Sequence, residues 1–268
     1  MGHNVYRESL FAGKVAYIAG GTSGINLGIA LRFAELGARV AVVGRKADKA
    51  DSAANEIRAL KVEALGLSAD VREYEAVERS MQETLNAFGG IDIVVSGAAG
   101  NFPAPAVSIS AKGFKTVVDI DLIGTYNVFH AAFGVVRKPG ASLIAISAPQ
   151  ALHPMPWQAH VCAAKAGINM LVKCLAMEWG PAGVRVNGIS PGPIAGTEGM
   201  ARLAPTEAIE KGVKSRIALR RFGRPDEVGD AAIYLCSPAA EFVTGTILDC
   251  DGGSQLGDAS RDCLTKTR

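Results

Sequence analysis

Cysteine is scarce in this sequence and follows no pattern. Five of the 268 residues are cysteines, with no CxxC pair and no Cys/His cluster, and they are Cys162, Cys174, Cys236, Cys250 and Cys263. An odd number of widely spaced cysteines argues against a secreted disulfide framework and against a zinc site. We expect reduced thiols that mostly serve packing, and no metal.

The sequence also lacks an excess of charge and a long apolar run. The 28 basic and 26 acidic residues leave a formal charge of +2, so no global field would concentrate nucleic acid or an acidic membrane. No segment approaches the ~18 uninterrupted apolar residues of a membrane span. Tyr6 stands where a myristoylation signal requires Ser or Thr, and the ending TKTR is not an SKL-type address. We expect a cytoplasmic protein with no nucleic-acid or membrane partner.

Short β-rich runs alternate with longer helical patterns along the whole chain. The runs include KVAYIAG, ARVAVVG, IDIVVSG, ASLIAISA and VRVNGIS, and the helical patterns include about 24–36, a long pattern ending at Val136, and about 158–179. Such alternation is typical of a parallel sheet with crossover helices. The prediction is an α/β, doubly wound Rossmann fold with a seven-stranded parallel sheet, and a single domain over 1–268.

Two segments of this pattern have a more specific interpretation. The stretch from Ser190 to about Pro205 is predicted to be irregular and to begin a substrate loop at about 190–217, because loops after the strands of such a sheet line its ligand crevice. A plain surface loop is the alternative. In the helix at about 158–179, one apolar stripe at helical spacing predicts packing against the core or another subunit, and consists of Ile168, Leu171, Val172, Leu175, Ala176 and Trp179.

A glycine-rich turn follows the first predicted strand. The string GGTSGINLG begins at Gly20 and lies between a strand and an amphipathic helix, which is the context of a dinucleotide site rather than of a structural turn. Glycines there let backbone amides approach a pyrophosphate at the helix N-terminus. The predicted contacts are Gly20, Thr22, Ser23, Gly24 and Ile25.

The second strand ends in two cations. Arg45 and Lys46 stand where NAD-selective sites place an acidic residue on the ribose hydroxyls. Two cations suit a 2′-phosphate, so the predicted cofactor is NADPH. A solvated loop pair is the alternative.

These features, together with AAGN at 98–101, Lys165 and PGPI at 191–194, resemble the short-chain dehydrogenase/reductase family over about 10–255. The strings AAGNFPAPA, FKTVVDIDLIGTYNV, AMEWGPAGVRVN and PGPIAGTEGMARL look like its 2,4-dienoyl-CoA reductase branch, in particular the peroxisomal type. Two positions depart from the family pattern: Asn26 replaces a third glycine, and Ser96-Gly97 replace an Asn-Asn pair.

The resemblance implies further cofactor contacts. Asp70 and Val71 would meet the adenine, Ala98 and Gly100 the ribose, and Lys165 the nicotinamide ribose hydroxyls. Pro191, Ile194 and Thr197 belong to the same implied set, with Ile194 and Thr197 on the nicotinamide carboxamide. The family is commonly tetrameric through its long helices, which implies a homotetramer.

The family's tyrosine is missing. Most members carry YxxxK, in which the tyrosine exchanges a proton with an alcohol or ketone, but Val161 stands four residues before Lys165. A valine cannot donate a proton, so the departure favours reduction of a carbon–carbon double bond. The dienoyl-CoA reductases share this absence. The mitochondrial type uses a tyrosine at the position of Gln150, and glutamine is a poor acid, so the peroxisomal arrangement is favoured.

In that arrangement an aspartate works with the lysine and a water, and the match is Asp121. Helical phase supports it, because Asp121 shares a stripe with Val117 and Thr125 while Asp119 points elsewhere. A carboxylate on an apolar stripe needs a partner, and Lys165 is the one we expect. Burial disfavours the charged carboxylate and a neighbouring lysine favours it, so the sequence leaves open whether Asp121 or a bound water delivers the proton. An aspartate buried only as an ion-pair partner is the alternative.

Asn101 completes the predicted catalytic set. It follows the turn after the fourth strand, and its amide would donate to a thioester carbonyl that gains negative charge, unless it only stabilises the turn. The prediction is an NADPH-dependent reductase that converts a 2,4-dienoyl-CoA thioester to a 3-enoyl-CoA. The alternatives are a reductase of another enoyl or carbonyl substrate, with Ser147, His160 or water replacing the tyrosine, and an inactive NADP-binding scaffold.

Overall fold

The apolar runs of the sequence form parallel strands joined by helices. In the computed structural model, which describes residues 6–261, seven strands make one sheet in the order β3-β2-β1-β4-β5-β6-β7, and every pairing is parallel. They are β1 (Val15–Ala19), β2 (Arg39–Gly44), β3 (Ala64–Ser68), β4 (Ile93–Ser96), β5 (Ser142–Ile146), β6 (Arg185–Pro191) and β7 (Ile247–Cys250). The predicted doubly wound sheet is confirmed. Its strand order reverses between β1 and β4, which places a ligand crevice at their carboxyl ends.

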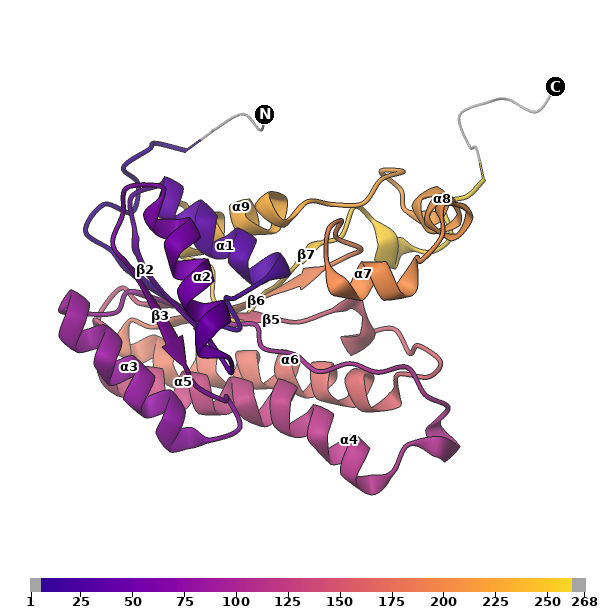
Figure 1. The fold of residues 1–268 in the computed structure, drawn as a ribbon, viewed down its shortest axis with the longest axis horizontal. Coiled ribbons are helices and arrows are strands. Elements are labelled where there is room, and N and C mark those ends of the chain that lie inside the picture. Colours follow the sequence, from indigo (N-terminus) through magenta and orange to yellow (C-terminus); the bar gives the residue numbers. More distant parts are fainter. Residues whose placement is uncertain (1–5, 262–268) are drawn as a thin grey trace.

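Helices cover both faces of the sheet (Figure 1). One face carries α1 (Gly24–Glu35), α2 (Ala47–Arg58) and α9 (Pro225–Cys236). The other carries α3 (Tyr74–Phe88), α5 (Gly124–Val135) and α6 (Ala159–Trp179), with α4 (Ala111–Val118) packed on α6. The central strands are buried on both sides, which explains why β1 and β2 are nearly continuous apolar runs.

Each face has its own core. Phe33, Ile57 and Ile233 are fully buried in the core under α1, α2 and α9, and Phe129 and Ile168 in the core under α3, α5 and α6. The predicted stripe of α6 is confirmed as a packing face, because its six residues are buried or half-buried.

The segment 159–182 is long and apolar enough to cross a membrane by length and composition. Half of its apolar window is buried in the fold, so contact with the core accounts for that composition.

The long helical pattern ending near Val136 is not one regular helix. A π-helical turn, Asp119–Ile123, separates α4 from α5, and α5 ends at Val135. The extra residue in this turn shifts the helical phase at the position of the predicted catalytic aspartate.

The predicted irregular stretch over 190–205 is irregular only in part, at 192–197 and 204–205. Strand β6 extends to Pro191, and the chain then forms two helices, α7 (Glu198–Leu203) and α8 (Glu207–Arg216). Thr197 caps α7, since its hydroxyl accepts a hydrogen bond from the Met200 amide at 3.3 Å. The loop after β6 is therefore a short helical cover, which Figure 1 shows as two orange helices beside the ends of β6 and β7.

The cysteines agree only in part with the expected packing role. Cys162, Cys174, Cys236 and Cys250 are free, whereas Cys263 lies outside the described residues. Burial raises the pKa of Cys236 to about 11, which leaves an unreactive packing thiol. Cys174 is exposed, so packing does not explain it.

Candidate active site

A buried ion pair lies at the end of β5. Asp121 is 1% exposed and Lys165 is 6% exposed, and the carboxylate Oδ2 lies 3.2 Å from the lysine Nζ. The expected pairing is therefore present. Breaking such a pair leaves an uncompensated buried charge, so each group depends on the other.

Backbone groups fix both members of the pair. The Gly100 amide donates to Asp121 Oδ1 at 2.7 Å, and Lys165 Nζ donates to the Ile146 carbonyl at 3.0 Å. An ammonium has three donors, of which one bonds Ile146 and one faces Asp121, so Lys165 keeps one for a ligand. Asp121 Oδ2 is buried and has no hydrogen bond of good geometry within residues 6–261, which leaves an acceptor for a water or substrate.

The π-helical turn presents Asp121 to this pair. Asp119, two residues earlier, points to the surface and bonds Lys115 at 2.6 Å. Thr125 donates to the Asp121 carbonyl at 2.7 Å and accepts from Ser96 at 3.2 Å, which ties the turn to β4. Such turns are frequent at functional sites, and here one places an acid against the sheet end.

The position of the family tyrosine holds no acid. Val161 is buried one turn before Lys165, and its side chain has no proton to give. Ser147, an alternative donor, is committed elsewhere, because its hydroxyl donates to Asn169 Oδ1 at 2.5 Å. Gln150 donates to Gln158 at 3.0 Å.

His160 is packed rather than paired. It is fully buried, with the Phe102 ring 4.4 Å and the Phe114 ring 6.4 Å from its own ring centre. Neither ring nitrogen has a hydrogen-bond partner in the described part of the chain. Its surroundings are aromatic, and no hydrogen bond joins it to Asp121 or Lys165 there.

Asn101 is exposed on the loop after β4 and directly follows Gly100, which bonds Asp121. Its side chain makes no hydrogen bond within residues 6–261, while the preceding Gly100 is held by Asp121. Because the backbone at Gly100 is fixed and the Asn101 side-chain amide has no partner there, this amide is available to donate to a ligand.

A cleft of about 370 Å³ opens at the carboxyl ends of β1, β2 and β4. Of the predicted cofactor contacts, its walls include Gly20, Thr22, Ser23, Arg45, Lys46, Asp70, Val71 and Ala98. They also include residues that the sequence patterns did not assign to the cofactor: Asn26, Val43, Gly44, Lys49, Ala69, Gly97, Ala99, Ile120 and Glu198. Lys49 could have been found, because it lies one helical turn after Arg45.

The glycine turn forms a cradle that side chains would fill. Gly20 has a φ of 78°, and a Cβ there would lie 2.6 Å from the Ala98 amide nitrogen. Gly24 begins α1 with a φ of 58°. The close backbone approach and the free amides at a helix N-terminus fit a dinucleotide pyrophosphate.

Some charged side chains along this cleft have ion-pair partners and others have none among the described residues. Arg45, Lys46 and Lys49 are exposed and make no ion pair among the described residues. Asp70 is engaged, because Arg72 donates to both of its carboxylate oxygens, at 3.0 and 2.6 Å. The hydrogen bond from the Arg72 side chain lowers the pKa of Asp70 and keeps it charged.

The remaining predicted contacts lie outside the walls of this cleft. Gly100 faces Asp121, and Ile25 lies within α1. Pro191 pairs with Cys250 in the sheet, and buried Ile194 pairs with Gly223 and lines a neighbouring pocket. Thr197 is close to the glycine turn, because a Cβ on Gly24 would lie 3.8 Å from its methyl group.

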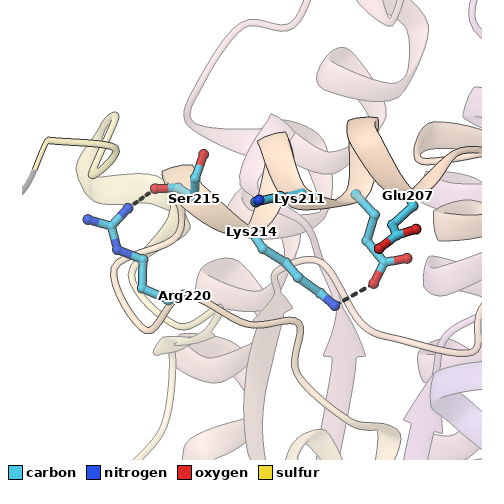
Figure 2. A pocket seen from close by; sticks show the side chains of 6 residues that line it. Glu207, Lys211, Lys214, Ser215 and Arg220 are labelled. Carbon is cyan, nitrogen blue, oxygen red and sulfur yellow. Dashed lines mark hydrogen bonds and ion pairs between the residues drawn. The ribbon is translucent and has the colours of Figure 1, made fainter.

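A second pocket, of about 420 Å³, lies on α8 (Figure 2). Lys214 is paired with Glu210, and Arg220 donates to the Ser215 carbonyl. Lys211 makes no ion pair in the described part of the chain, so it is the free cation of a pocket that also holds Glu207.

Residues 19–255 match the protein family described as Enoyl-(Acyl carrier protein) reductase. The peroxisomal 2,4-dienoyl-CoA reductase (3E-enoyl-CoA-producing) of Saccharomyces cerevisiae is 41% identical over 92% of this chain and 86% of the relative. A citronellol catabolism dehydrogenase from Pseudomonas aeruginosa has a similar structure, with a TM-score of 0.83 and 36% identity over 94% and 98% of the two chains. A short-chain dehydrogenase from Burkholderia cenocepacia, solved in complex with NADP, has a TM-score of 0.84 and 26% identity over 91% and 99%.

The reversed strand order and the glycine cradle are features of a dinucleotide-binding α/β fold. The chain belongs to the short-chain dehydrogenase/reductase family of oxidoreductases.

Proposed function

We propose that the protein is an NADPH-dependent 2,4-dienoyl-CoA reductase that forms a 3-enoyl-CoA. The observation that carries the proposal is the buried Asp121–Lys165 pair beside a valine at the tyrosine position. This arrangement retains a lysine and an acid but has no group placed to protonate a carbonyl oxygen in the usual way. The similarity to the yeast dienoyl-CoA reductase supports the same assignment.

The proposed reaction adds a hydride and a proton to a conjugated thioester. When bound, NADPH supplies the hydride to the δ-carbon, and the two conjugated double bonds become one double bond between the β- and γ-carbons. Asp121, held by Gly100 and Lys165, directs a proton to the α-carbon, either itself or through a water on Oδ2. Lys165 keeps the carboxylate oriented and offers its remaining donor to the nicotinamide ribose hydroxyls.

Asn101 is proposed to stabilise the charge that the hydride drives onto the substrate. Negative charge reaches the thioester oxygen as a dienolate forms, and a preoriented amide donor lowers that barrier. Loss of one such donor typically costs ~3–4 kcal/mol in the transition state.

Cations at two places support the proposed ligands. Arg45, Lys46 and Lys49 lie at the ribose end of the cleft and suit the 2′-phosphate of NADPH. Lys211 on α8, which makes no ion pair among the described residues, suits a phosphate of coenzyme A.

The direct test is loss of NADPH absorbance with 2,4-dienoyl-CoA substrates of several chain lengths. We expect turnover with dienoyl-CoA and none with 3-ketoacyl-CoA. Protein that binds NADPH but turns over no dienoyl-CoA of any length would contradict the proposal.

One observation favours a second candidate, a reductase or dehydrogenase of another substrate. A similar structure is named a citronellol catabolism dehydrogenase. A panel that includes 2-enoyl-CoA, 3-ketoacyl-CoA and unsaturated or alcohol terpenoids separates the two candidates, because each predicts a different preferred substrate. Equal, very slow activity in wild type and Asp121→Asn would instead favour an inactive cofactor-binding scaffold.

We also propose a homotetramer that works in the cytoplasm. Exposed apolar side chains on α5 and α6 support the assembly, among them Tyr126, Met170 and Met177. The yeast relative is named peroxisomal, and the segments considered for targeting, at Gly2 and TKTR, lie outside the described residues. Fractionation of the native cells distinguishes a cytoplasmic pool from an organellar one.

A further inference from the structure

The backbone segment 97–100 is held at both ends by side chains. At its start, Asn26 Nδ2 donates to the Gly97 carbonyl at 2.8 Å, and at its end the Gly100 amide donates to Asp121 Oδ1 at 2.7 Å. The same Nδ2 donates to the Gly20 carbonyl at 3.3 Å. One amide group thus bridges the glycine turn to the segment that ends on the catalytic carboxylate.

Asn26 occupies a space that residue 97 leaves open. A Cβ at Gly97 would lie 2.2 Å from Asn26 Oδ1, so only one of the two positions can carry a side chain. The two backbones are also in close contact, because a Cβ at Gly20 would meet Ala98 at 2.6 Å. A shift of the glycine turn therefore moves the segment.

The donor end of Asn26 accounts for its presence better than its volume does. Its Oδ1 is buried with no hydrogen-bond partner among residues 6–261, which is a cost that alanine or glycine at this position would avoid. The two carbonyl contacts offset that cost. They also leave the amide fixed in one orientation, since both partners are acceptors.

We propose that Asn26 is a positioning residue that couples the dinucleotide turn to the Asp121–Lys165 pair. It fixes the position of Gly20 relative to Gly97. Because residues 97–100 are continuous backbone, this also fixes the Gly100 amide that bonds Asp121. Loss of the amide donor therefore has two effects: it weakens nucleotide binding, and it displaces Asp121. The part of this inference that concerns the acid rests on the proposed function.

The first experiment is titration of the full chain with NADPH and NADH. Asn26→Ala removes both donor contacts. It is expected to raise the dissociation constant of whichever nucleotide binds more tightly about tenfold, the equivalent of one or two hydrogen bonds. Asn26→Asp keeps the volume but turns an acceptor toward two carbonyls, so it is expected to bind more weakly than Asn26→Ala. Binding by Asn26→Asp that equals wild type would overturn the proposal.

The reciprocal exchange is the second variant. Gly97→Asn alone is expected to disrupt the turn, because its side chain collides with Asn26. Asn26→Gly combined with Gly97→Asn places one amide in the same space and is expected to restore nucleotide affinity to within about threefold of wild type. A double variant no better than Gly97→Asn alone would contradict the shared-space argument.

The third measurement separates positioning from folding. With dienoyl-CoA, Asn26→Ala is expected to lower kcat about tenfold and to leave the KM for dienoyl-CoA within about twofold, because the acid moves while the acyl site does not. The matched control is Asn187, a buried amide that donates to the Val243 carbonyl at 3.0 Å between β6 and the chain before β7. Asn187→Ala is expected to lower the thermal midpoint without changing nucleotide affinity.

The two proposals fail in different ways. Nucleotide binding without dienoyl-CoA turnover contradicts the proposed reductase function, whereas the nucleotide titrations of the Asn26 variants still test the coupling. Unchanged affinity and unchanged kcat in Asn26→Ala contradict the coupling alone, and a wild type that binds neither nucleotide overturns both.

Discussion

At the residue scale, the central feature is one buried ion pair, Asp121 with Lys165, and each member is also held by a backbone group. Asp121 meets Lys165 of α6 and the Gly100 amide after β4, while Lys165 reaches the Ile146 carbonyl of β5. Helical phase in the sequence was enough to place Asp121 inside and Asp119 outside. The two backbone partners were beyond such reasoning, because they depend on how β4 and β5 end in space.

Replacement of the acid is expected to remove most of the turnover. Asp121→Asn keeps the shape but removes the carboxylate that directs the proton, so kcat with dienoyl-CoA should fall about 10²–10⁴-fold while NADPH still binds. Steady-state NADPH oxidation measures this. The control is Asp119→Asn, at a half-buried carboxylate two residues away that pairs with Lys115, for which kcat should stay within about twofold. Equal activity in Asp121→Asn and wild type would show that Asp121 only pairs with Lys165.

The cations after β2 are expected to set the choice of nucleotide. Arg45→Ala with Lys46→Ala should weaken NADPH about tenfold or more and leave NADH nearly unchanged, because only NADPH carries the 2′-phosphate. Calorimetric titration of both nucleotides gives the ratio. Lys173→Ala, an exposed cation on α6, serves as the control. An equal loss for both nucleotides would contradict a 2′-phosphate role.

At the element scale, regular periodicity was predictable and its interruptions were not. Residues 111–135 keep an apolar stripe, but the π-helical turn at Asp119–Ile123 is a tertiary feature that ties to β4 through Thr125 and Ser96. The stretch after β6 was predicted to be irregular, and its helices were missed for a different reason. Thr197 followed by Glu198 is a helix-start signal, and the glycines and prolines around it obscured a six-residue helix.

The start of α9 is expected to carry an acid-sensitive part of the stability. Arg221 donates to Glu227 at 2.6 Å and the Arg224 amide donates to it at 2.8 Å. The Arg221 hydrogen bond lowers the pKa of Glu227 from 4.5 to about 2. A lowered folded-state pKa stabilises the fold above the unfolded value, and this contribution is lost as the pH falls from 4.5 toward 2.

Glu227→Gln tests that contribution. The variant should unfold with about 1 kcal/mol less free energy than wild type at neutral pH, because a helix-capping carboxylate is lost. The difference should shrink as the pH approaches 2, where wild type is protonated as well. Urea unfolding across that range measures the difference in free energy. Glu83→Gln, at an exposed side chain of α3, is the control. A difference that does not change with pH would contradict the ionic origin.

At the scale of the whole molecule, the fold class followed from simple alternation. Strand runs such as β1 and β2 are nearly continuous apolar runs because helices bury both faces, and that signature distinguishes a doubly wound sheet from a sandwich. What alternation could not reveal is how the turns meet. The contact between the glycine turn and the end of β4 joins Asn26 to Gly97, 71 residues apart.

The exposed apolar surface of α5 and α6 is expected to mediate assembly. Met170 and Met177 are 60% and 82% exposed, which is costly on a free surface when such residues gather. Light scattering should give about four times the 27.8 kDa chain mass, and Met170→Asp should reduce it while the fold persists. Val107→Asp, at a side chain that is 94% exposed in the short 3-10 helix Ala106–Ser108, should not. A monomeric wild type would contradict the assembly.

The most direct test of the central claim is a product analysis with NADPH deuterated at the transferred position. The account predicts that wild type consumes NADPH with 2,4-dienoyl-CoA, that the product is a 3-enoyl-CoA with deuterium on the δ-carbon, and that Asp121→Asn loses this turnover. A protein that binds NADPH yet leaves dienoyl-CoA unchanged, or that labels a carbonyl carbon instead, would contradict it.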